Sequence, residues 1–382
     1  MKKFDVIIIG GGPSGALCGI ELQKKGIKTC IIDQSSFPRD KVCGGLLTQK
    51  SVDLIEKYLA DLNPSEYIID KTKVINFFYE NQKITSFHTN QTFYYTERKA
   101  FDHILIKKYK ELGGILFENR KINKEDIHLI DNSIQLDFEE LKYKVLIGAD
   151  GCNSVLARLN QLKRYDAFCI QGKQKHEHLE DKDIRIYFGI ARYGYGWYFP
   201  KKDYASVGII DDNATKSINK NAKPFFSKIS DTKLNNIKGA KIPSGHLIKL
   251  KNLSNNTLLI GDAAGFTDPI TGEGLFYAML SGIYAAEAIL ENIDVNPDNV
   301  KNSYLKKIKP ILRNIRYALF YQKILYNPKV LNIFLNYVTK HKSFALFYIE
   351  KVMSNYQFNY TNFLGSYLFH IKRHRGVNAK RK

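Results

Sequence analysis

Short apolar runs that end at glycine or at an acidic residue recur along the chain. The clearest of these runs are Phe4 to Ile9, Ile27 to Ile32, Lys144 to Gly148 and Thr257 to Ile260. Runs of this length bounded by turn residues are typical of buried strands. Helical spacing follows three of them, over Ala16 to Lys25, from Val155 after the cap Asn153-Ser154, and over Leu275 to Leu290. The pattern predicts an α/β fold with a doubly wound nucleotide-binding domain.

The remaining segments have other patterns of apolar and polar residues. Residues 73–95 alternate apolar and polar side chains, and 165–250 are mostly strand-like, so both are expected in a second, mostly antiparallel sheet. Residues 98–113 predict a helix that stops at glycine, and residues 34–50 predict a loop. After residue 295 the pattern predicts helices interrupted at Pro310 and Pro328.

A glycine-rich turn follows the first strand directly. Gly10, Gly12 and Gly15 have the G-x-G-x-x-G spacing, and Asp33 ends the second strand. The glycines allow a tight turn and the approach of a pyrophosphate to a helix N-terminus, while the acid binds a ribose hydroxyl. Strand, turn, helix, second strand and acid together predict a dinucleotide site, and an acid at residue 33 disfavours a 2′-phosphate.

A second glycine-rich turn lies at Gly261 to Gly274. Asp262 follows an apolar run, and Gly272 and Gly274 flank Glu273 just before the helix that begins at Leu275. A helix N-terminus preceded by glycines suits an anionic ligand. For a flavin, a ribityl hydroxyl would donate to Asp262. The alternative is a joint that needs glycine only for tight packing.

Composition indicates the cellular compartment of the protein and where its charge lies. No uncharged apolar run approaches the ~18–20 residues of a membrane span, and the apolar part of the basic N-terminus is too short for a signal peptide. Five cysteines without a CxxC pair indicate a reducing cytosol, with neither structural disulfides nor a metal site. Of the net charge of +20, about +16 lies in residues 301–382, where seventeen Lys and Arg face one acid.

Two further features have open interpretations. Cys43, beside Gly44 and Gly45, is either a small buried apolar residue or a thiol placed near a ligand. The segment Tyr193 to Pro200 alternates aromatic residues with glycine and holds the single tryptophan, Trp197. It is either an ordinary sheet face or the wall of an apolar cavity.

The order of three blocks resembles FAD-dependent oxidoreductases of the aromatic-hydroxylase superfamily. These blocks are Gly10 to Gly15 with Asp33, Gly148 to Gly151, and Gly261 to Gly274. The blocks Phe37 to Gly45, Tyr195 to Pro200 and Asp268 to Gly274, with Arg98 and Phe101-Asp102, look like the geranylgeranyl reductase family within it. The resemblance covers residues 1 to about 295. Leu46 replaces a third glycine that the family often has, which narrows that loop.

The resemblance implies a three-part organisation. An FAD-binding domain would comprise residues 1–72, 97–164 and 251–295, with an inserted antiparallel substrate domain at 73–96 and 165–250. Residues 296–382 would form a basic, aromatic-rich helical region.

The resemblance also assigns roles to individual residues. The pyrophosphate would contact Gly10, Gly12, Pro13, Ser14 and Gly15, the ribose Asp33, and the ribityl chain Asp262. Arg98 would lie along the dinucleotide, and Arg39 and Leu275 would also bind the cofactor. Gly272 and Gly274 would sit against the isoalloxazine ring, which Cys43, Gly44 and Gly45 would approach from the other side. The prenyl pocket would be lined by Tyr195, Trp197, Phe199 and Gly45.

The implied reaction is two-electron reduction of carbon–carbon double bonds in a prenyl chain. Hydride would come from reduced FAD, which NAD(P)H or another reductant would reduce in a transient encounter, and Cys43 is the one motif residue placed to act at the ring. One alternative is a flavin monooxygenase or halogenase of the same fold. Another is an FAD-containing membrane-surface or RNA-binding protein without catalysis.

The basic C-terminal region suggests a partner. Sixteen Tyr and Phe accompany its seventeen basic residues, which favours docking on an anionic membrane surface. Nucleic acid is not expected, because no RNA- or DNA-binding motif accompanies the charge. The alternative is that the aromatic residues pack the helices onto the flavin domain. We expect a cytoplasmic protein, peripheral on the inner face of the cytoplasmic membrane; no pattern specifies an oligomeric state.

Overall fold

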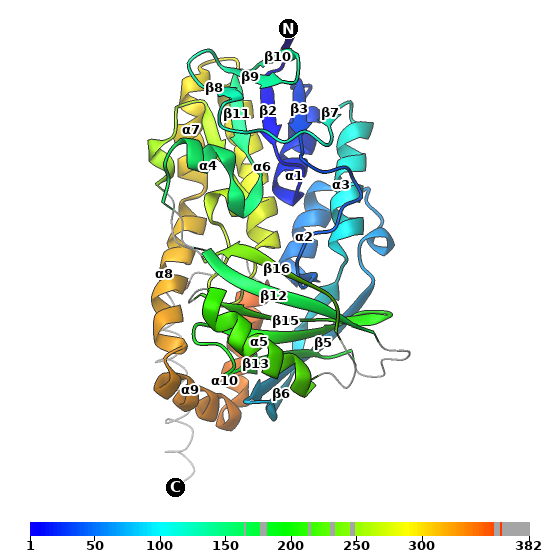
Figure 1. The fold of residues 1–382 in the computed structure, drawn as a ribbon, viewed down its shortest axis with the longest axis vertical. Helices are drawn as coiled ribbons and strands as arrows, with labels where there is room; N and C mark the ends of the chain where they lie inside the picture. Colours follow the sequence, from blue (N-terminus) through cyan, green and yellow to red (C-terminus); the bar gives the residue numbers. More distant parts are fainter. Residues whose placement is uncertain are drawn as a thin grey trace, which may run out of the picture.

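The computed structural model describes residues 1–163, 166–175, 182–212, 215–229, 234–244, 249–354 and Tyr360. Within these residues the chain forms two larger sheets stacked along the long axis of the molecule, with helices beside both (Figure 1). The last residues of the basic tail, from His370 to Lys382, lie outside the described residues.

The first sheet is parallel and has five strands in the order β17-β11-β2-β3-β7. The strands are β2 (Val6–Ile9), β3 (Thr29–Ile32), β7 (Ile115–Phe117), β11 (Val145–Gly148) and β17 (Thr257–Leu259). Ile9 pairs with both Ile32 and Gly148, and Gly148 pairs with Leu259. Because all five strands run in one direction, the segments that follow β2, β3, β11 and β17 meet at one edge of the sheet. The sequence predicted these four strands, and the structure confirms them.

The helices of this domain are α1 (Pro13–Gln23), α3 (Arg98–Glu111), α4 (Val155–Leu159) and α6 (Leu275–Asn292), and α1 contacts both α3 and α6. Three of them begin where the sequence placed them, and α1 begins three residues earlier than predicted, at Pro13. The predicted cap of α4 is present, since the Ser154 hydroxyl accepts a hydrogen bond from the Ala157 amide. A small sheet near the N-terminus was not predicted: β1 (Lys2–Lys3), β8 (Ile127–His128), β9 (Ser133–Leu136) and β10 (Glu139–Lys142) (Figure 1).

The second sheet has eight strands in the order β16-β12-β15-β14-β13-β5-β6-β4. Every neighbouring pair is antiparallel except β13 and β5. The strands are β4 (Leu46–Leu47), β5 (Asp70–Tyr79), β6 (Gln82–Tyr95), β12 (Asp166–Lys175), β13 (Ile184–Phe188), β14 (Gly194–Pro200), β15 (Tyr204–Asp211) and β16 (Asn235–Pro243).

Two predictions about these segments were incomplete. Residues 165–250 include a helix, α5 (Thr215–Ile229), which covers one face of the large sheet. Its buried residues Ile218, Ala222 and Phe225 have helical spacing and contact the apolar side chains of that face. The predicted loop at 34–50 contains β4, which pairs with β6, and the start of α2 (Gln49–Tyr58).

Short 3₁₀ segments join these elements. They are η1 (Pro64–Glu66), η2 (Gly151–Asn153), η3 (Leu250–Asn252), η4 (Gly261–Ala264) and η5 (Pro297–Asn299).

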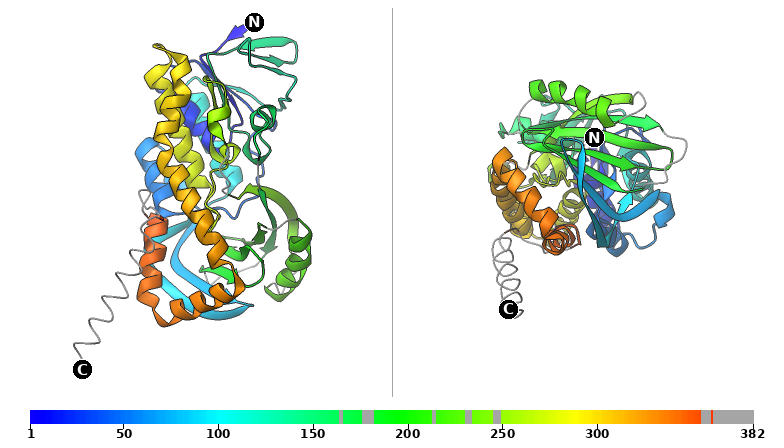
Figure 2. Two further views of the ribbon diagram at one scale, coloured as in Figure 1. Left: turned by 90° about the vertical axis from the view of Figure 1, so that its left-hand side faces the viewer. Right: turned by 90° about the horizontal axis from the view of Figure 1, so that it is seen from below.

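Four helices follow: α7 (Val300–Lys307), α8 (Lys309–Leu325), α9 (Pro328–Lys340) and α10 (Lys342–Ser354). Pro310 and Pro328 lie in the first turns of α8 and α9, so each proline begins a new helix, as expected. Helix α8 runs beside both sheets, whereas α9 and α10 lie at the far end of the large sheet (Figures 1 and 2). Among the described residues, no helix has both the length and the apolar character needed to cross a bilayer.

Candidate functional site

The glycine-rich turn after β2 is shaped by contacts that exclude larger side chains. Gly10 has φ of +107°, and a Cβ atom there would lie 2.4 Å from the carbonyl oxygen of Ala149. A Cβ at Gly15 would lie 2.0 Å from the carbonyl oxygen of Gly10. Gly12 is the N-cap of α1 and Pro13 opens the helix, with Ser14 buried behind it. The first amides of α1 therefore face the edge of the parallel sheet, in the geometry that binds phosphate groups.

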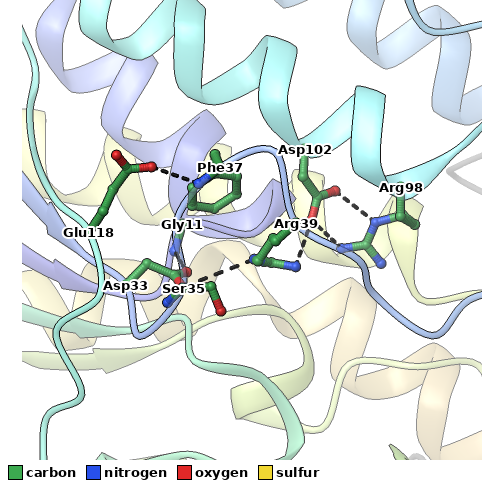
Figure 3. Close-up of polar contacts among 8 residues, drawn as sticks. All are labelled: Gly11, Asp33, Ser35, Phe37, Arg39, Arg98, Asp102 and Glu118. Atoms are coloured by element: carbon green, nitrogen blue, oxygen red, sulfur yellow. Dashed lines mark hydrogen bonds and ion pairs between the residues drawn. The ribbon is translucent and has the colours of Figure 1, made fainter. Parts of the chain in front are cut away.

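Asp33 lies beside this turn, at the end of β3. Its carboxylate accepts hydrogen bonds from the amides of Gly11 and Ser35, both at 2.8 Å (Figure 3). Each carboxylate oxygen can accept a further hydrogen bond, so the position suits a ribose hydroxyl. The two amide bonds also hold the acid against the glycine-rich turn.

Two arginines share a buried acid next to Asp33. The Arg39 guanidinium lies 4.0 Å from Asp33 and 3.3 Å from Asp102, and it approaches the position where Gly12 would carry a Cβ atom. Arg98 donates two hydrogen bonds to Asp102, at 2.7 and 2.8 Å, so that charges alternate from Asp33 to Arg98 (Figure 3). Burial opposes the charge of Arg98, but Asp102 outweighs it and raises the pKa of the guanidinium above its ordinary value.

Asp102 is a site residue that we did not predict. Its side chain is fully buried, and it holds both arginines. The sequence placed Asp102 in a block that resembles the family but gave it no role. A further signal was the spacing of four residues between Arg98 and Asp102 on a predicted helix, which favours an ion pair.

Asp262 follows β17, two strands from the glycine-rich turn. It lies in η4, where its carboxylate accepts a hydrogen bond from Thr267, close to Gly274 at the N-terminus of α6. A Cβ at Gly261 would lie 2.8 Å from the hydroxyl oxygen of Ser14. The structure thus brings the two glycine-rich turns together, although some 250 residues separate them in the sequence.

The Cys43 to Gly45 loop packs on strand β14. A Cβ at Gly44 would lie 2.7 Å from the Phe199 ring and 3.4 Å from the Trp197 ring nitrogen. Cys43 Sγ accepts a hydrogen bond from the Gly45 amide at 3.4 Å and also interacts with the Arg98 side chain. The loop therefore joins the acid–arginine chain to the aromatic face of the large sheet.

Lys201 is a second residue that we did not predict. It follows β14, is almost fully buried, and donates hydrogen bonds to the carbonyl oxygens of Thr96 and Gly45. Burial lowers its pKa to about 8, although the negative charge of Glu97 opposes the shift. No local pattern marks this lysine, because its burial arises only when the loop meets the sheet.

A small cavity lies between the large sheet and the turn after Asp262. Its walls include Tyr193 just before β14, Tyr195 of β14, Ile242 of β16, the turn residues Thr267 to Pro269 and Gly272, and Gln322 of α8. Tyr195 borders the cavity. Among the described residues, Trp197 and Phe199 are not part of its wall and pack instead with Cys169 and Ile184. Leu275 lies nearby at the start of α6.

The residues at this edge fit an FAD molecule. The glycine cradle and the first amides of α1 suit a diphosphate, Asp33 suits a ribose, and Asp262 with Gly274 suits a ribityl chain and the ring edge. The roles assigned to single residues stay predictions, which their placement supports.

Comparisons with known proteins agree with this fit. The family model described as FAD binding domain matches residues 3–168. An uncharacterized protein of Methanosarcina barkeri is 32% identical over 347 residues, 88% of each chain. Digeranylgeranylglycerophospholipid reductase 3 of Methanosphaera stadtmanae is 28% identical over 79% of this chain and 81% of its own. A geranylgeranyl bacteriochlorophyll reductase-like protein from Thermoplasma acidophilum has the same fold, with a TM-score of 0.75 and 22% identity over 86% of this chain and 88% of that chain.

We predict that Asp262→Ala weakens FAD binding. Loss of a hydrogen bond to a carboxylate costs about 1.5–3 kcal/mol, which corresponds to a rise of roughly 10- to 150-fold in the dissociation constant. Titration of the apoprotein with FAD measures this dissociation constant. The control is Asp294→Ala, which removes an exposed acid. Equal affinities in the two variants would contradict the role of Asp262.

We also predict that Lys201 makes stability depend on pH. Its pKa is about 8 in the folded protein against 10.5 for an ordinary lysine. Below pH 8 the buried lysine is charged, and the free-energy penalty of its burial has its full value. The penalty is relieved as pH rises from 8 to 10.5, by up to roughly 3 kcal/mol. Denaturant unfolding at pH 7.5 and 9.5 should show the wild type gaining stability relative to Lys201→Met. Parallel pH profiles for the two proteins would contradict the prediction.

Proposed function

The chain belongs to the geranylgeranyl reductase-like family of FAD-dependent oxidoreductases, and from this we propose that it reduces carbon–carbon double bonds of a prenyl lipid. The relative from Methanosphaera stadtmanae, named as a reductase of a digeranylgeranyl lipid, supports this substrate class. The observation that carries the proposal is the packing of the Cys43 to Gly45 loop against β14. That packing places an aromatic, buried sheet face directly beside the FAD-binding edge.

The sheet face is suited to an apolar chain. Tyr195, Trp197 and Phe199 alternate along β14 and point to one side, where they join buried aliphatic side chains. Tyr198 points to the other side and packs under α5. An isolated alkene offers no charge for recognition, so the protein must hold it by apolar contacts and exclude water from it.

Bound FAD supplies two electrons as a hydride, and the second carbon of the alkene then requires a proton. We assign the proton to Sγ of Cys43, because this thiol lies at the loop that joins the FAD edge to the aromatic face. Arg98 beside it is cationic, and a nearby cation stabilises the thiolate that remains after proton transfer. The reductant of FAD would be NAD(P)H or a similar donor that binds transiently.

Anaerobic single-turnover reoxidation of the reduced flavin by a prenyl lipid tests the reaction. We expect reoxidation together with a product that is two hydrogen atoms heavier per reduced bond. Reoxidation that requires oxygen and yields a hydroxylated or halogenated product would identify a monooxygenase or halogenase instead.

We predict that Trp197→Ala slows this reoxidation at a temperature far below unfolding, while the flavin spectrum is unchanged. Tyr198→Ala is the matched control, since both residues are buried in β14 but on opposite faces. Each truncation should cost roughly 3–5 kcal/mol of stability. If both variants slow reoxidation equally, the aromatic face is sheet core and not a substrate site.

We further propose that the outer face of α8 docks on an anionic membrane. This face carries exposed Tyr317, Phe320 and Ile324, with Arg313 and Arg316 exposed among them. Apolar side chains among cations match the interface of an anionic bilayer, and each basic residue near it contributes about 1 kcal/mol. Tyr304, Tyr326 and Phe344 of the C-terminal region are buried, so these helices also pack on the rest of the protein, as the alternative interpretation expected.

Vesicle flotation tests the docking face. We predict binding to vesicles with anionic lipid, weaker binding in high salt, and no binding to neutral vesicles. The double substitution Phe320→Ser and Ile324→Ser should reduce binding. Phe138→Ser and Ile130→Ser are the controls, because these apolar residues are even more exposed than Phe320 and Ile324 and lie in turns of the small sheet near the N-terminus. An equal loss in both double variants, or binding to nucleic acid alone, would rule the docking face out.

A further inference from the structure

The turn after Asp262 is held in shape from within. We call residues 268–273 the ring-edge loop, because Gly272 and Gly274 are the residues predicted to lie against the flavin ring. The buried carboxylate of Asp268 accepts hydrogen bonds from the amides of Ile270 and Thr271, at 2.8 and 3.0 Å. The Asp268 amide donates to the Glu273 carbonyl, and the Gly272 amide donates to the Asp268 carbonyl. The loop is thus a compact turn around one acid.

The same loop is bound from outside by the C-terminal region. The Gln322 amide donates to the carbonyl oxygen of Pro269 at 2.9 Å, and the Tyr326 hydroxyl donates to that of Ile270 at 3.1 Å. The Tyr360 hydroxyl donates to Asp268 Oδ2 at 2.8 Å. Three successive residues of the loop, 268–270, therefore accept hydrogen bonds from side chains in α8 or C-terminal to it.

These three side chains are buried, with exposed fractions of 4% or less. Burying an amide or a hydroxyl costs free energy unless it is hydrogen-bonded, and apolar residues would pack these helices at no such cost. Asn314, another buried polar residue of α8, accepts a hydrogen bond from the Tyr360 amide and so fixes that tyrosine. Gln322, Tyr326 and Tyr360 therefore hold the loop, and Asn314 holds Tyr360.

A buried ion pair continues the connection. Lys50 of α2 lies 2.6 Å from Glu273 of the loop and donates to the carbonyl oxygen of Val352 in α10 at 3.0 Å. Thr48 donates to the same glutamate at 2.6 Å. The loop is therefore attached to α8, to Tyr360 and, through Lys50, to α10.

We propose that Gln322, Tyr326 and Tyr360 are positioning residues that hold the ring-edge loop against the flavin, so that the C-terminal region is part of the FAD site. None of the three needs to touch the flavin, because each acts through the backbone or the acid of the loop. The inference rests on the proposed placement of the flavin ring at Gly272 and Gly274, and it is independent of the substrate. It gives the C-terminal helices and Tyr360 a role beyond docking.

The test uses the FAD-loaded protein with Tyr326→Phe and Tyr360→Phe, which remove one hydroxyl each and keep the ring. We expect the FAD dissociation constant to rise roughly 2- to 10-fold in each variant, since a hydrogen bond contributes about 0.5–1.5 kcal/mol net. We also expect the visible absorption band and the fluorescence of the bound flavin to change. Gln322→Met is a third variant, which keeps the side-chain length if one tyrosine variant does not fold.

Tyr304→Phe is the matched control. The Tyr304 hydroxyl is also buried in the C-terminal region and donates to a carbonyl oxygen at 2.9 Å, but its acceptor is Leu259 of β17 and not the loop. The control should lose similar stability and leave the flavin spectrum unchanged. Wild-type spectra and affinities in the loop variants, or equal changes in the control, would overturn the proposal. Neither readout needs a substrate, so failure of prenyl reduction would be seen separately.

Discussion

The close contact between α1 and the β17–α6 joint is the constraint on which the rest of the structure depends. A Cβ atom at Gly282 would lie 2.3 Å from the carbonyl oxygen of Ser14, and one at Gly261 would meet the Ser14 side chain. Only glycine allows the backbones of two helices to approach so closely. This approach places the first amides of α1 and those of α6 at one edge of the parallel sheet, where a single dinucleotide can contact both.

Buried charge is arranged in pairs around that edge. Asp102 has no exposure and pairs with Arg98 and Arg39, the second of which also lies near Asp33. Glu273 is paired with Lys50, whose side chain is buried. An unpaired charge at these depths would be costly, whereas a paired and hydrogen-bonded charge is tolerated and keeps a fixed geometry. The pairs join segments that are distant in sequence, so they position the loops of the site relative to one another. Lys201 differs, because its partners are backbone carbonyls and its burial lowers its pKa.

The large sheet and the C-terminal helices complete the site from the other side. Strand β14 presents aromatic residues to the Cys43 to Gly45 loop, and α8 contributes Gln322 to the cavity wall while its opposite face carries exposed Phe320 and Ile324. One helix thus connects the surface proposed to meet lipid with the loop proposed to meet the flavin. This arrangement would let an apolar substrate remain close to the bilayer from which it comes.

The sequence alone determined four of the five parallel strands and the two glycine-rich turns, because these features depend on local spacing: apolar runs, glycines at fixed intervals, and acids at strand ends. The family resemblance added FAD as the cofactor. It did not reveal α5, Asp102, Lys201 or the attachment of the ring-edge loop to Gln322, Tyr326 and Tyr360. Single polar residues in these segments look like ordinary surface residues in the sequence. Their burial and partners are decided only when segments up to 300 residues apart pack together, as Lys50 and Val352 do, so only the tertiary structure could show them.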